Sequence, residues 1–371
     1  MAVFEQTQGL PLHLEKSNQL DMHAASELAE VRPEARFDEA RLAAFLRGKL
    51  PGTERPLRVW QFTGGAANLT YLLDYGTHQY VLRRSPPGPL PRGGHDMRRE
   101  YTVLSRLWRA YPPAPRAFLF CDDPEIVGTP FFVMERRHGV VVRTELPEAF
   151  RTHPDAPRRM ALALVDALAD LHAVDFRAIG LADLGRPEGF IERQIEGWWK
   201  RWEAARTMDL PDLAAVYEWL RANRPARSEA TLVHNDYKLD NVMFDPADPG
   251  RLVAVFDWDM CTLGDPLSDL GALLAYWVRP DDPPVFRALT TMPLDERFPT
   301  RDELVARYAA RSGRPLSDVR FYHVLGLYRV TVIVAQLHAR FVRGLSRDPR
   351  YAALGRALPA LARAARTVAE A

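Results

Sequence analysis

The sequence predicts an α+β fold in two lobes: a smaller first lobe built on an antiparallel sheet and a larger, mostly helical second lobe. Between residues 58 and 135, short β-branched and aromatic runs alternate with turn residues, as in antiparallel strands. From about residue 158 onward, apolar residues recur at helical spacing. The 371 residues exceed the ~250 to 300 that one core usually serves. We expect an extension over 1–37, a first lobe over 38–138 and a second lobe over 139–371.

Composition excludes several classes of partner. The net charge is +1, so no nucleic acid or acidic membrane partner is expected. The two cysteines, Cys121 and Cys261, lie far apart in apolar surroundings, which argues against a disulfide scaffold and favours a reducing cytoplasm. No signal-peptide core is present, and Arg329 interrupts the longest apolar run.

The first lobe is predicted element by element. Residues 1–37 carry few signals and are expected to pack on the first lobe or on a partner subunit, which leaves a homodimer open. Asp38 is placed to cap an amphipathic helix that Pro51 and Gly52 close. Strands are expected at 58–62, 68–75, 79–83, 118–121 and 131–135, which makes a sheet of about five strands.

Two glycines, Gly64 and Gly65, lie in the loop between the first two of these strands. Glycine lets backbone N–H groups approach a phosphate closely, so the pair is a candidate nucleotide-binding loop. A plain β-turn is the alternative, because the chain has no G-x-x-x-x-G-K motif.

A helix is expected over 95–111, with Glu100 beside its apolar face. Glu100 is either a solvated carboxylate or the partner of a basic residue on the preceding strand, where Arg83 and Arg84 are the candidates. After Met134 and Glu135 the chain reaches Gly139, which is interpreted as a hinge between the lobes whose exposed backbone would suit the edge of an adenine. An ordinary strand end is the alternative.

The strongest signal is the spacing His234, Asp236, Lys238, Asn241, which matches the protein-kinase catalytic loop at each place. Residues 242–244 and 252–256 then read as two strands joined by turn formers, so a β-hairpin is expected. Antiparallel pairing would bring Asn241 beside Asp257, and an amide oxygen with a carboxylate suits Mg²⁺. Asp236 would accept or orient the proton of a hydroxyl. The pattern indicates phosphoryl transfer.

The second lobe is expected to be helical at 158–176, 190–205, 301–312, 317–343 and 350–370. His172, near the end of the first of these helices, is interpreted as a packed, hydrogen-bonded residue rather than a catalytic one. Three tryptophans, Trp198, Trp199 and Trp202, recur at helical spacing and are more typical of a core or groove wall than of a cation cage.

These motifs resemble the aminoglycoside phosphotransferase and choline kinase family, which shares the protein-kinase-like fold. The resemblance covers roughly residues 38–345, with its motifs in the same order along the chain. The stretches VLRRSPPG, MRREY and FDWDMCTLGDPLSDLG look like the branch related to kinase-like domains fused to acyl-CoA dehydrogenases.

The resemblance implies a small-molecule kinase that uses ATP and Mg²⁺ on a hydroxyl substrate. It implies Asp236 as catalytic base and Asn241 and Asp257 as magnesium ligands. It also implies Glu100 as partner of the phosphate-binding base and Asp269 as a buried brace of the catalytic loop. Lys238 is expected to touch the transferred phosphate.

One departure from the family leaves alternatives open. Kinases usually carry lysine where Arg83 stands, and arginine does not replace it simply, so a catalytically silent nucleotide-binding regulator is the competing class. The chain, however, has only four lysines and keeps the base and metal positions. Residues 271–371 hold sixteen arginines, no lysine and nine acids. This excess of seven positive charges favours an anionic acceptor such as a hydroxyacyl-CoA over an aminoglycoside or choline.

Overall fold

The computed structural model describes residues 27–63, 68–86, 96–226, 228–287 and 291–371. These residues group into two compact units. Unit 1 contains the chain up to Tyr101 and Ala117–Arg136, and unit 2 contains Thr102–Arg116 and Arg137–Ala371. Residues 102–116, which the sequence analysis assigned to the first lobe, therefore group with the second. No helix in the described ranges is long and apolar enough to cross a membrane.

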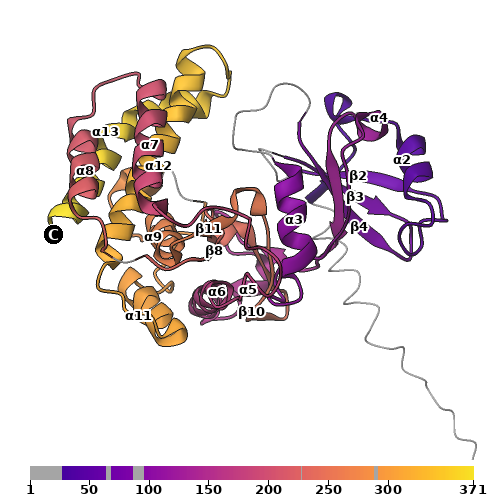
Figure 1. Ribbon diagram of the computed structural model, residues 1–371, viewed down its shortest axis with the longest axis horizontal. Coiled ribbons are helices and arrows are strands. Elements are labelled where there is room, and N and C mark those ends of the chain that lie inside the picture. The colour runs from indigo at the N-terminus through magenta and orange to yellow at the C-terminus, as the bar shows by residue number, and fades with distance from the viewer. Residues whose placement is uncertain (1–26, 64–67, 87–95, 227, 288–290) are drawn as a thin grey trace, which may run out of the picture. The chain divides into compact units, whose positions relative to one another are not determined.

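Unit 1 is built on an antiparallel sheet that has six strands within the described residues (Figure 1). The order is β1 (Leu28–Ala29), β2 (Arg58–Phe62), β3 (Leu69–Asp74), β4 (Gln79–Arg84), β6 (Phe131–Glu135) and β5 (Ala117–Cys121). The helical segments are η1 (Pro33–Ala35), α2 (Glu39–Leu46), α4 (Pro124–Val127) and the start of α3 (Met97–Leu107). The extra strand, β1, lies in the segment that was expected to be an extension.

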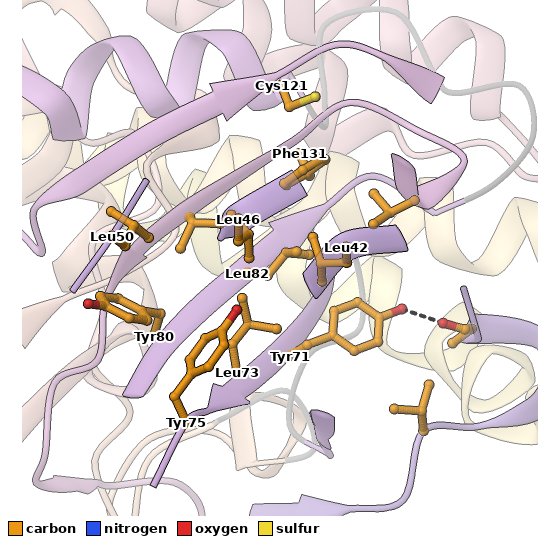
Figure 2. Packing of buried hydrophobic residues seen from close by; sticks show 14 residues of the cluster. Leu42, Leu46, Leu50, Tyr71, Leu73, Tyr75, Tyr80, Leu82, Cys121 and Phe131 are labelled. Carbon is orange, nitrogen blue, oxygen red and sulfur yellow. Dashed lines mark hydrogen bonds between the residues drawn. The ribbon is translucent and has the colours of Figure 1, made fainter. Parts of the chain in front are cut away.

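Helix α2 begins where the sequence predicts, because the Asp38 side chain accepts a hydrogen bond of 2.9 Å from the backbone N–H of Arg41. It ends at Leu46, earlier than the Pro51-Gly52 stop, and buries Leu42 and Leu46 against the sheet. Figure 2 shows this core, in which Tyr71 of β3 also donates a hydrogen bond of 2.7 Å to the carbonyl of Ala35. Residues just before α2 are thereby fastened to unit 1.

Unit 2 consists mainly of helices, with short strands beside them (Figure 1). Its strands are β7 (Val140–Val141), β8 (Thr231–Val233), β9 (Val242–Asp245), β10 (Asp248–Val255) and β11 (Thr262–Gly264), with the short helices η2 (Leu239–Asn241) and η3 (Trp258–Met260). Its helices are α5 (Glu148–Arg151), α6 (Ala156–His172), α7 (Phe190–Ala205), α8 (Pro211–Ala222), α9 (Pro266–Tyr276), α10 (Pro284–Arg287), α11 (Arg301–Ser312), α12 (Val319–Val342) and α13 (Pro349–Glu370).

Helix α12 packs against α7, α8, α9 and α13, and its approach to α9 depends on two glycines. A Cβ added to Gly326 would lie 2.3 Å from the carbonyl oxygen of Gly271, and one added to Gly271 would lie 2.1 Å from the carbonyl oxygen of Tyr322. Any larger residue would push the two backbones apart. The close contact sets α12 against the helix that carries Asp269.

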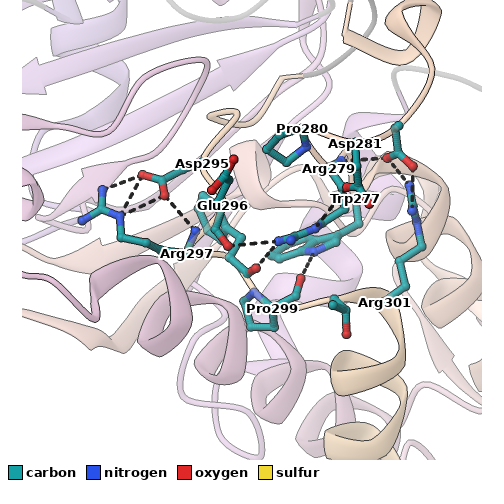
Figure 3. Close-up of polar contacts among 12 residues, drawn as sticks. Trp277, Arg279, Pro280, Asp281, Asp295, Glu296, Arg297, Pro299 and Arg301 are labelled. Carbon is teal, nitrogen blue, oxygen red and sulfur yellow. Dashed lines mark hydrogen bonds and ion pairs between the residues drawn. The ribbon is translucent and has the colours of Figure 1, made fainter.

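The connection between α9 and α11 is held by side-chain hydrogen bonds, which Figure 3 shows. The indole N–H of Trp277 donates to the carbonyl of Pro299 at 2.9 Å. Arg301 grips both carboxylate oxygens of Asp282, at 3.0 and 2.6 Å. These bonds hold Trp277 and Asp282, which follow α9, beside the start of α11.

Candidate functional site

The loop from His234 to Asn241 follows β8, and a buried carboxylate holds its start. Asp269 of α9 accepts hydrogen bonds from the backbone N–H groups of His234, at 2.6 Å, and Asn235, at 2.8 Å. Asn235 has a φ of +65°, a left-handed conformation that an ordinary residue adopts at some cost. Asp269 therefore stabilises a backbone shape that the sequence alone would not favour.

Asp269 is fully buried, and its surroundings keep it charged. Burial alone would raise its pKa, but the hydrogen bonds from the His172 ring and from the backbone N–H of His234 lower the pKa below its ordinary value. The His172 Nε2 lies 3.3 Å from Asp269, and its Nδ1 lies 2.7 Å from the hydroxyl of Tyr308. His172 is packed and hydrogen-bonded, as expected, and it supports Asp269, which holds the start of the loop.

The His234 ring ties the same loop to the end of β10. Its Nε2 lies 2.8 Å from the carbonyl oxygen of Phe256, and its Nδ1 lies 3.2 Å from the backbone N–H of Asp236. Since a backbone N–H can only donate and a carbonyl can only accept, the neutral ring carries its proton on Nε2. This tautomer fixes the backbone of Asp236.

The carboxylate of Asp236 is held from two sides. The Asn241 Nδ2 donates to its Oδ2 at 2.8 Å and also to the Asp236 carbonyl at 2.8 Å. The Lys238 Nζ lies 3.2 Å from the same Oδ2. The side chains of Asp236 and Lys238 keep 20% and 19% of their surface exposed, so both groups are fixed yet reachable from outside.

Lys238 remains a cation in this environment. Burial alone would lower its pKa, but the carboxylates of Asp236 and Asp240 outweigh burial and raise the pKa above its ordinary value. Its ammonium also lies over the ring of Tyr276, 5.2 Å from the centroid. Burial raises the pKa of Asp240, which Lys238 opposes and Asp236 reinforces. The loop thus offers one fixed positive charge among carboxylates.

The predicted hairpin is present and brings Asn241 and Asp257 together in the backbone. Val242 pairs with Val255 across β9 and β10, and the N–H of Phe256 donates to the carbonyl of Asn241 at 2.9 Å. Both strands extend further toward the turn than expected, β9 to Asp245 and β10 from Asp248, so the turn narrows to Pro246 and Ala247, and β10 ends at Val255 instead of Phe256.

Asp257 has a φ of +66°, and within the described residues it and Asn235 are the two non-glycine residues with positive φ. Left-handed backbone at non-glycine residues concentrates where function requires it. Asn241 donates two hydrogen bonds from its side-chain Nδ2, both to Asp236, and its Oδ1 takes part in neither. One amide oxygen and one carboxylate fit Mg²⁺, which usually takes few protein ligands. No group of three or more His, Cys, Asp or Glu in the described chain is arranged for a metal.

The two basic candidates of unit 1 lie next to each other on β4, so their side chains point to opposite faces of the sheet. Arg83 lies 3.2 Å, Nε to Oε2, from Glu100, whose side chain is 1% exposed. Arg84 points to the other face, where it donates to the Tyr71 hydroxyl at 3.1 Å and to the Ala35 carbonyl at 2.8 Å. Of the two basic candidates, Arg83 is therefore the partner of Glu100, and Arg84 belongs to the core.

The remaining predicted positions are placed as follows. Met134 and Glu135 end β6, where Met134 is buried and pairs with Val81. Gly64 and Gly65 lie outside the described residues. Gly139 precedes β7 in unit 2, and a Cβ there would lie 2.5 Å from the carbonyl oxygen of Phe244, so close packing requires this glycine. The roles of all these residues stay predictions.

Arg329 of α12 is the residue that sequence reasoning missed. Its guanidinium donates to the carbonyl of Asn235, directly before Asp236. The one available signal was an arginine that interrupts the long apolar run around 324–337. A position 94 residues away from Asn235 gave no reason to connect the two.

Comparison with known proteins places this site in context. The profile of the phosphotransferase enzyme family matches residues 58–307. Acyl-CoA dehydrogenase family member 11 from Pongo abelii is 32% identical over 327 residues, which cover 86% of this chain and 41% of that protein. A crystal structure from Ralstonia eutropha JMP134, described as a candidate aminoglycoside phosphotransferase, is 30% identical with a TM-score of 0.77. That match covers 90% of this chain and 99% of the other.

Choline kinase from Cryptosporidium parvum Iowa II shares the fold, with a TM-score of 0.57 at 11% identity over 89% of this chain and 98% of its own. The two-lobed kinase-like fold expected from the sequence is thus confirmed, as is the likeness to the acyl-CoA dehydrogenase relatives. The chain spans about two fifths of the length of the Pongo abelii relative.

Proposed function

The chain belongs to the phosphotransferase enzyme family, and on that premise we propose that it transfers the γ-phosphoryl group of ATP to a hydroxyl of a small molecule. One observation carries the proposal. The Asp236 carboxylate is held by Asn241 and Lys238 on a loop whose backbone is braced by buried Asp269. Phosphoryl transfer needs a fixed acceptor-orienting carboxylate more than it needs covalent chemistry.

Asp236 orients the acceptor hydroxyl and accepts its proton. With Oδ2 engaged by Asn241 and Lys238, the second oxygen of the carboxylate is the one directed to the acceptor. Lys238, kept cationic, offsets negative charge on the transferred group. Arg83, held by Glu100, provides a second cation for nucleotide phosphates.

The donor atoms of Asn241 and Asp257 are of the kind that Mg²⁺ binds. Asn241 through Oδ1 and Asp257 would hold Mg²⁺, since the amide nitrogen of Asn241 is committed to Asp236. Bound Mg²⁺ supplies charge neutralisation to the phosphates. Gly64, Gly65, Met134 and Glu135 remain the candidate contacts to ATP. The cytoplasm is the compartment that we propose, since Cys121 and Cys261 are buried free thiols.

An anionic acceptor is favoured over a polycation. The excess of seven positive charges in 271–371 supports it, and so does the likeness to acyl-CoA dehydrogenase family proteins, for which a hydroxyacyl-CoA would be a natural companion substrate. Arg83 in the lysine position favours a second candidate function, a silent nucleotide-binding regulator. The retained contact between Arg83 and Glu100 supports the active form.

A phosphate-transfer screen tests the proposal. The full chain is incubated with ATP and Mg²⁺ and with hydroxyacyl-CoAs, aminoglycosides, choline and sugars in turn, and phosphorylated products are identified by mass spectrometry. We expect product from at least one class, most strongly from an anionic one. Tight ATP binding with no product in any class would instead support the regulator.

The metal assignment has its own test, which does not depend on turnover. Replacing Asp257 with Ala should remove the Mg²⁺ dependence of nucleotide affinity, measured by calorimetry with and without the ion. Asp259→Ala, two residues further along, serves as the matched control and should retain that dependence. An unchanged Mg²⁺ effect in Asp257→Ala would contradict the assignment.

A further inference from the structure

Arg329 is a buried cation that has no carboxylate partner among the described residues. Its side chain is 7% exposed, and one N–H group donates to the carbonyl of Asn235. Its Nε–H has no hydrogen-bond acceptor, and no carboxylate in the described chain lies within ion-pair distance of the guanidinium. A buried charge without a partner is strongly unfavourable, so a partner is expected from outside the chain.

A second arginine, exposed on α7, lies against the same tryptophan as Arg329. Arg201 of α7 lies over the ring of Trp198, 4.4 Å from the centroid, and Arg329 lies over the same ring at 5.3 Å. Burial, with the positive charge of Arg329, lowers the pKa of Arg201 below its ordinary value. No ion pair to Arg201 is present in the described part of the chain either. The two cations repel each other, and the ring of Trp198, which both contact, carries no full negative charge to neutralise them.

Three other arginines of the chain have partners within the described residues. Arg83 is paired with Glu100, and Arg301 is gripped by Asp282. Arg84, buried without a carboxylate, has acceptors on its Nε and on both terminal nitrogens. The usual explanation of a buried arginine, that the fold itself satisfies it, therefore holds for Arg84 and fails for the Nε of Arg329.

The position of the pair connects it to the reaction. Asn235, which receives the Arg329 bond, is followed immediately by Asp236, whose Cα lies ~3.8 Å further along the chain. The Sδ of Met260 lies 4.0 Å from Arg329, and the Met260 side chain is 36% exposed. A ligand that reaches Asp236 is thus within a few bond lengths of the partly exposed Met260 and of Arg329 beside it.

We propose that Arg329 and Arg201 bind a carboxylate or phosphate group of the acceptor, which makes the acceptor a small anionic alcohol. The anionic group neutralises the two guanidinium groups and supplies the acceptor that the Arg329 Nε–H lacks. Its hydroxyl is then held a few bonds away at Asp236. This inference rests on the proposed function and names the substrate class of the same site.

Matched acceptors test the substrate class. Phosphorylation by ATP and Mg²⁺ is measured for 3-hydroxybutyrate against 3-hydroxybutyramide, and for glycerol 3-phosphate against glycerol. The wild-type chain should prefer the anionic member of at least one pair by about tenfold to a hundredfold in kcat/KM, as expected for a charged hydrogen bond. The pair that shows the preference tells whether the group is a carboxylate or a phosphate.

Arg201→Gln is the informative variant, because Arg201 is the less buried of the two and its loss threatens folding least. The ratio of kcat/KM for the anionic acceptor over the neutral one should fall toward one in Arg201→Gln. It should persist in Lys200→Gln, which removes the same charge from the neighbouring exposed residue of α7. Arg329→Lys, which keeps a charge but loses the fork, should also reduce the preference. Equal use of both members by the wild-type chain would overturn the inference and leave phosphoryl transfer intact.

Binding is tested separately, so that failure of the two proposals can be told apart. Inorganic phosphate at millimolar concentration, without nucleotide, should raise the unfolding temperature of the wild-type chain and of Lys200→Gln more than that of Arg201→Gln. The same shift in all three proteins would overturn the anion site whether or not any acceptor is phosphorylated. A reduced shift in Arg201→Gln together with no phosphorylation would support the anion site and contradict the proposed function.

Discussion

At the scale of single residues, the site depends on groups whose charge is fixed by their neighbours. Asp269 is kept ionised by His172 and the loop, and Lys238 is kept cationic by Asp236 and Asp240. Arg329 is the exception, since no carboxylate in the described chain pairs with it and its Nε–H has no acceptor there. Asp269, Lys238 and Arg329 lie on three different segments, so each acts through tertiary contact rather than through local sequence.

Replacing Asp269 with Asn should destabilise the protein by on the order of 2 to 4 kcal/mol. A carboxylate accepts one backbone N–H on each oxygen, whereas an amide has a single acceptor oxygen. Unfolding in urea measures the loss. Asp183→Asn, at an exposed position, is the control, and a loss no larger than in that control would show that the brace is unimportant.

The lowered pKa of Asp269 adds a pH dependence to the same comparison. Because its folded pKa lies below its ordinary value of 3.8, the charged carboxylate stabilises the fold above that pH. The contribution is lost as the pH falls below it. Wild-type unfolding free energy should therefore decline more steeply below about pH 4 than that of Asp269→Asn.

At the scale of elements, helix α12 makes contacts with several parts of unit 2 that its own sequence does not predict. Gly326 sets its contact with α9, His323 lies near the Arg301–Asp282 pair, and Arg329 reaches the 234–241 loop. The helix itself was predicted over 317–343 and runs over Val319–Val342. Its partners were not predicted, because helical periodicity gives one buried face and does not say which helix covers it.

Gly326→Ala should destabilise the protein by on the order of 1 to 3 kcal/mol, since its Cβ would meet the backbone of Gly271. Gly197→Ala in α7 is the matched change. There the nearest atom is the end of a flexible arginine at 3.9 Å, so the variant should gain up to about 1 kcal/mol from helix propensity. Thermal unfolding of both variants checks the opposite signs, and a shared sign would contradict the close contact of α9 with α12.

From His323 we expect the stability of the fold to depend on pH in a second range, between about pH 6.5 and 4. It lines a cavity of about 430 Å³ with Arg301 and Arg320. Burial, with the charge of Arg301, lowers the pKa of His323 to about 4. Since the folded pKa lies below the unfolded value of ~6.5, stability is full above pH 6.5 and declines as the pH falls toward 4.

The decline should be on the order of 2 to 3 kcal/mol and should disappear in His323→Leu. Chemical unfolding between pH 7 and 4 measures it. His78→Gln, on an exposed turn, should keep the wild-type slope. An unchanged slope in His323→Leu would show that the imidazole is not the titrating group.

At the scale of the whole molecule, much of the fold could be predicted and less of the site. The bounds of β2, β6, α7 and α11 were predicted to the residue, because each has a clear period and clear end signals. β1, at two residues, is too short to show a period. The proximity of Asn241 and Asp257 could be predicted, since a short turn between two strands implies that the strands pair antiparallel. The sequence could not decide between Arg83 and Arg84, because the answer depends on which face of the sheet each side chain occupies. It could not identify Arg329, because that residue reaches the loop only through the packing of α12.

The central claim is that the 234–241 loop performs phosphoryl transfer with Asp236 as its orienting base. Asp236→Asn keeps the size of the side chain and removes its charge, so ATP affinity should change by no more than about threefold while turnover falls by about 10² to 10⁴. Phosphate transfer to the acceptor found in the screen is measured beside ATP binding in the same preparations. Equal turnover in Asp236→Asn and wild-type protein would contradict the claim.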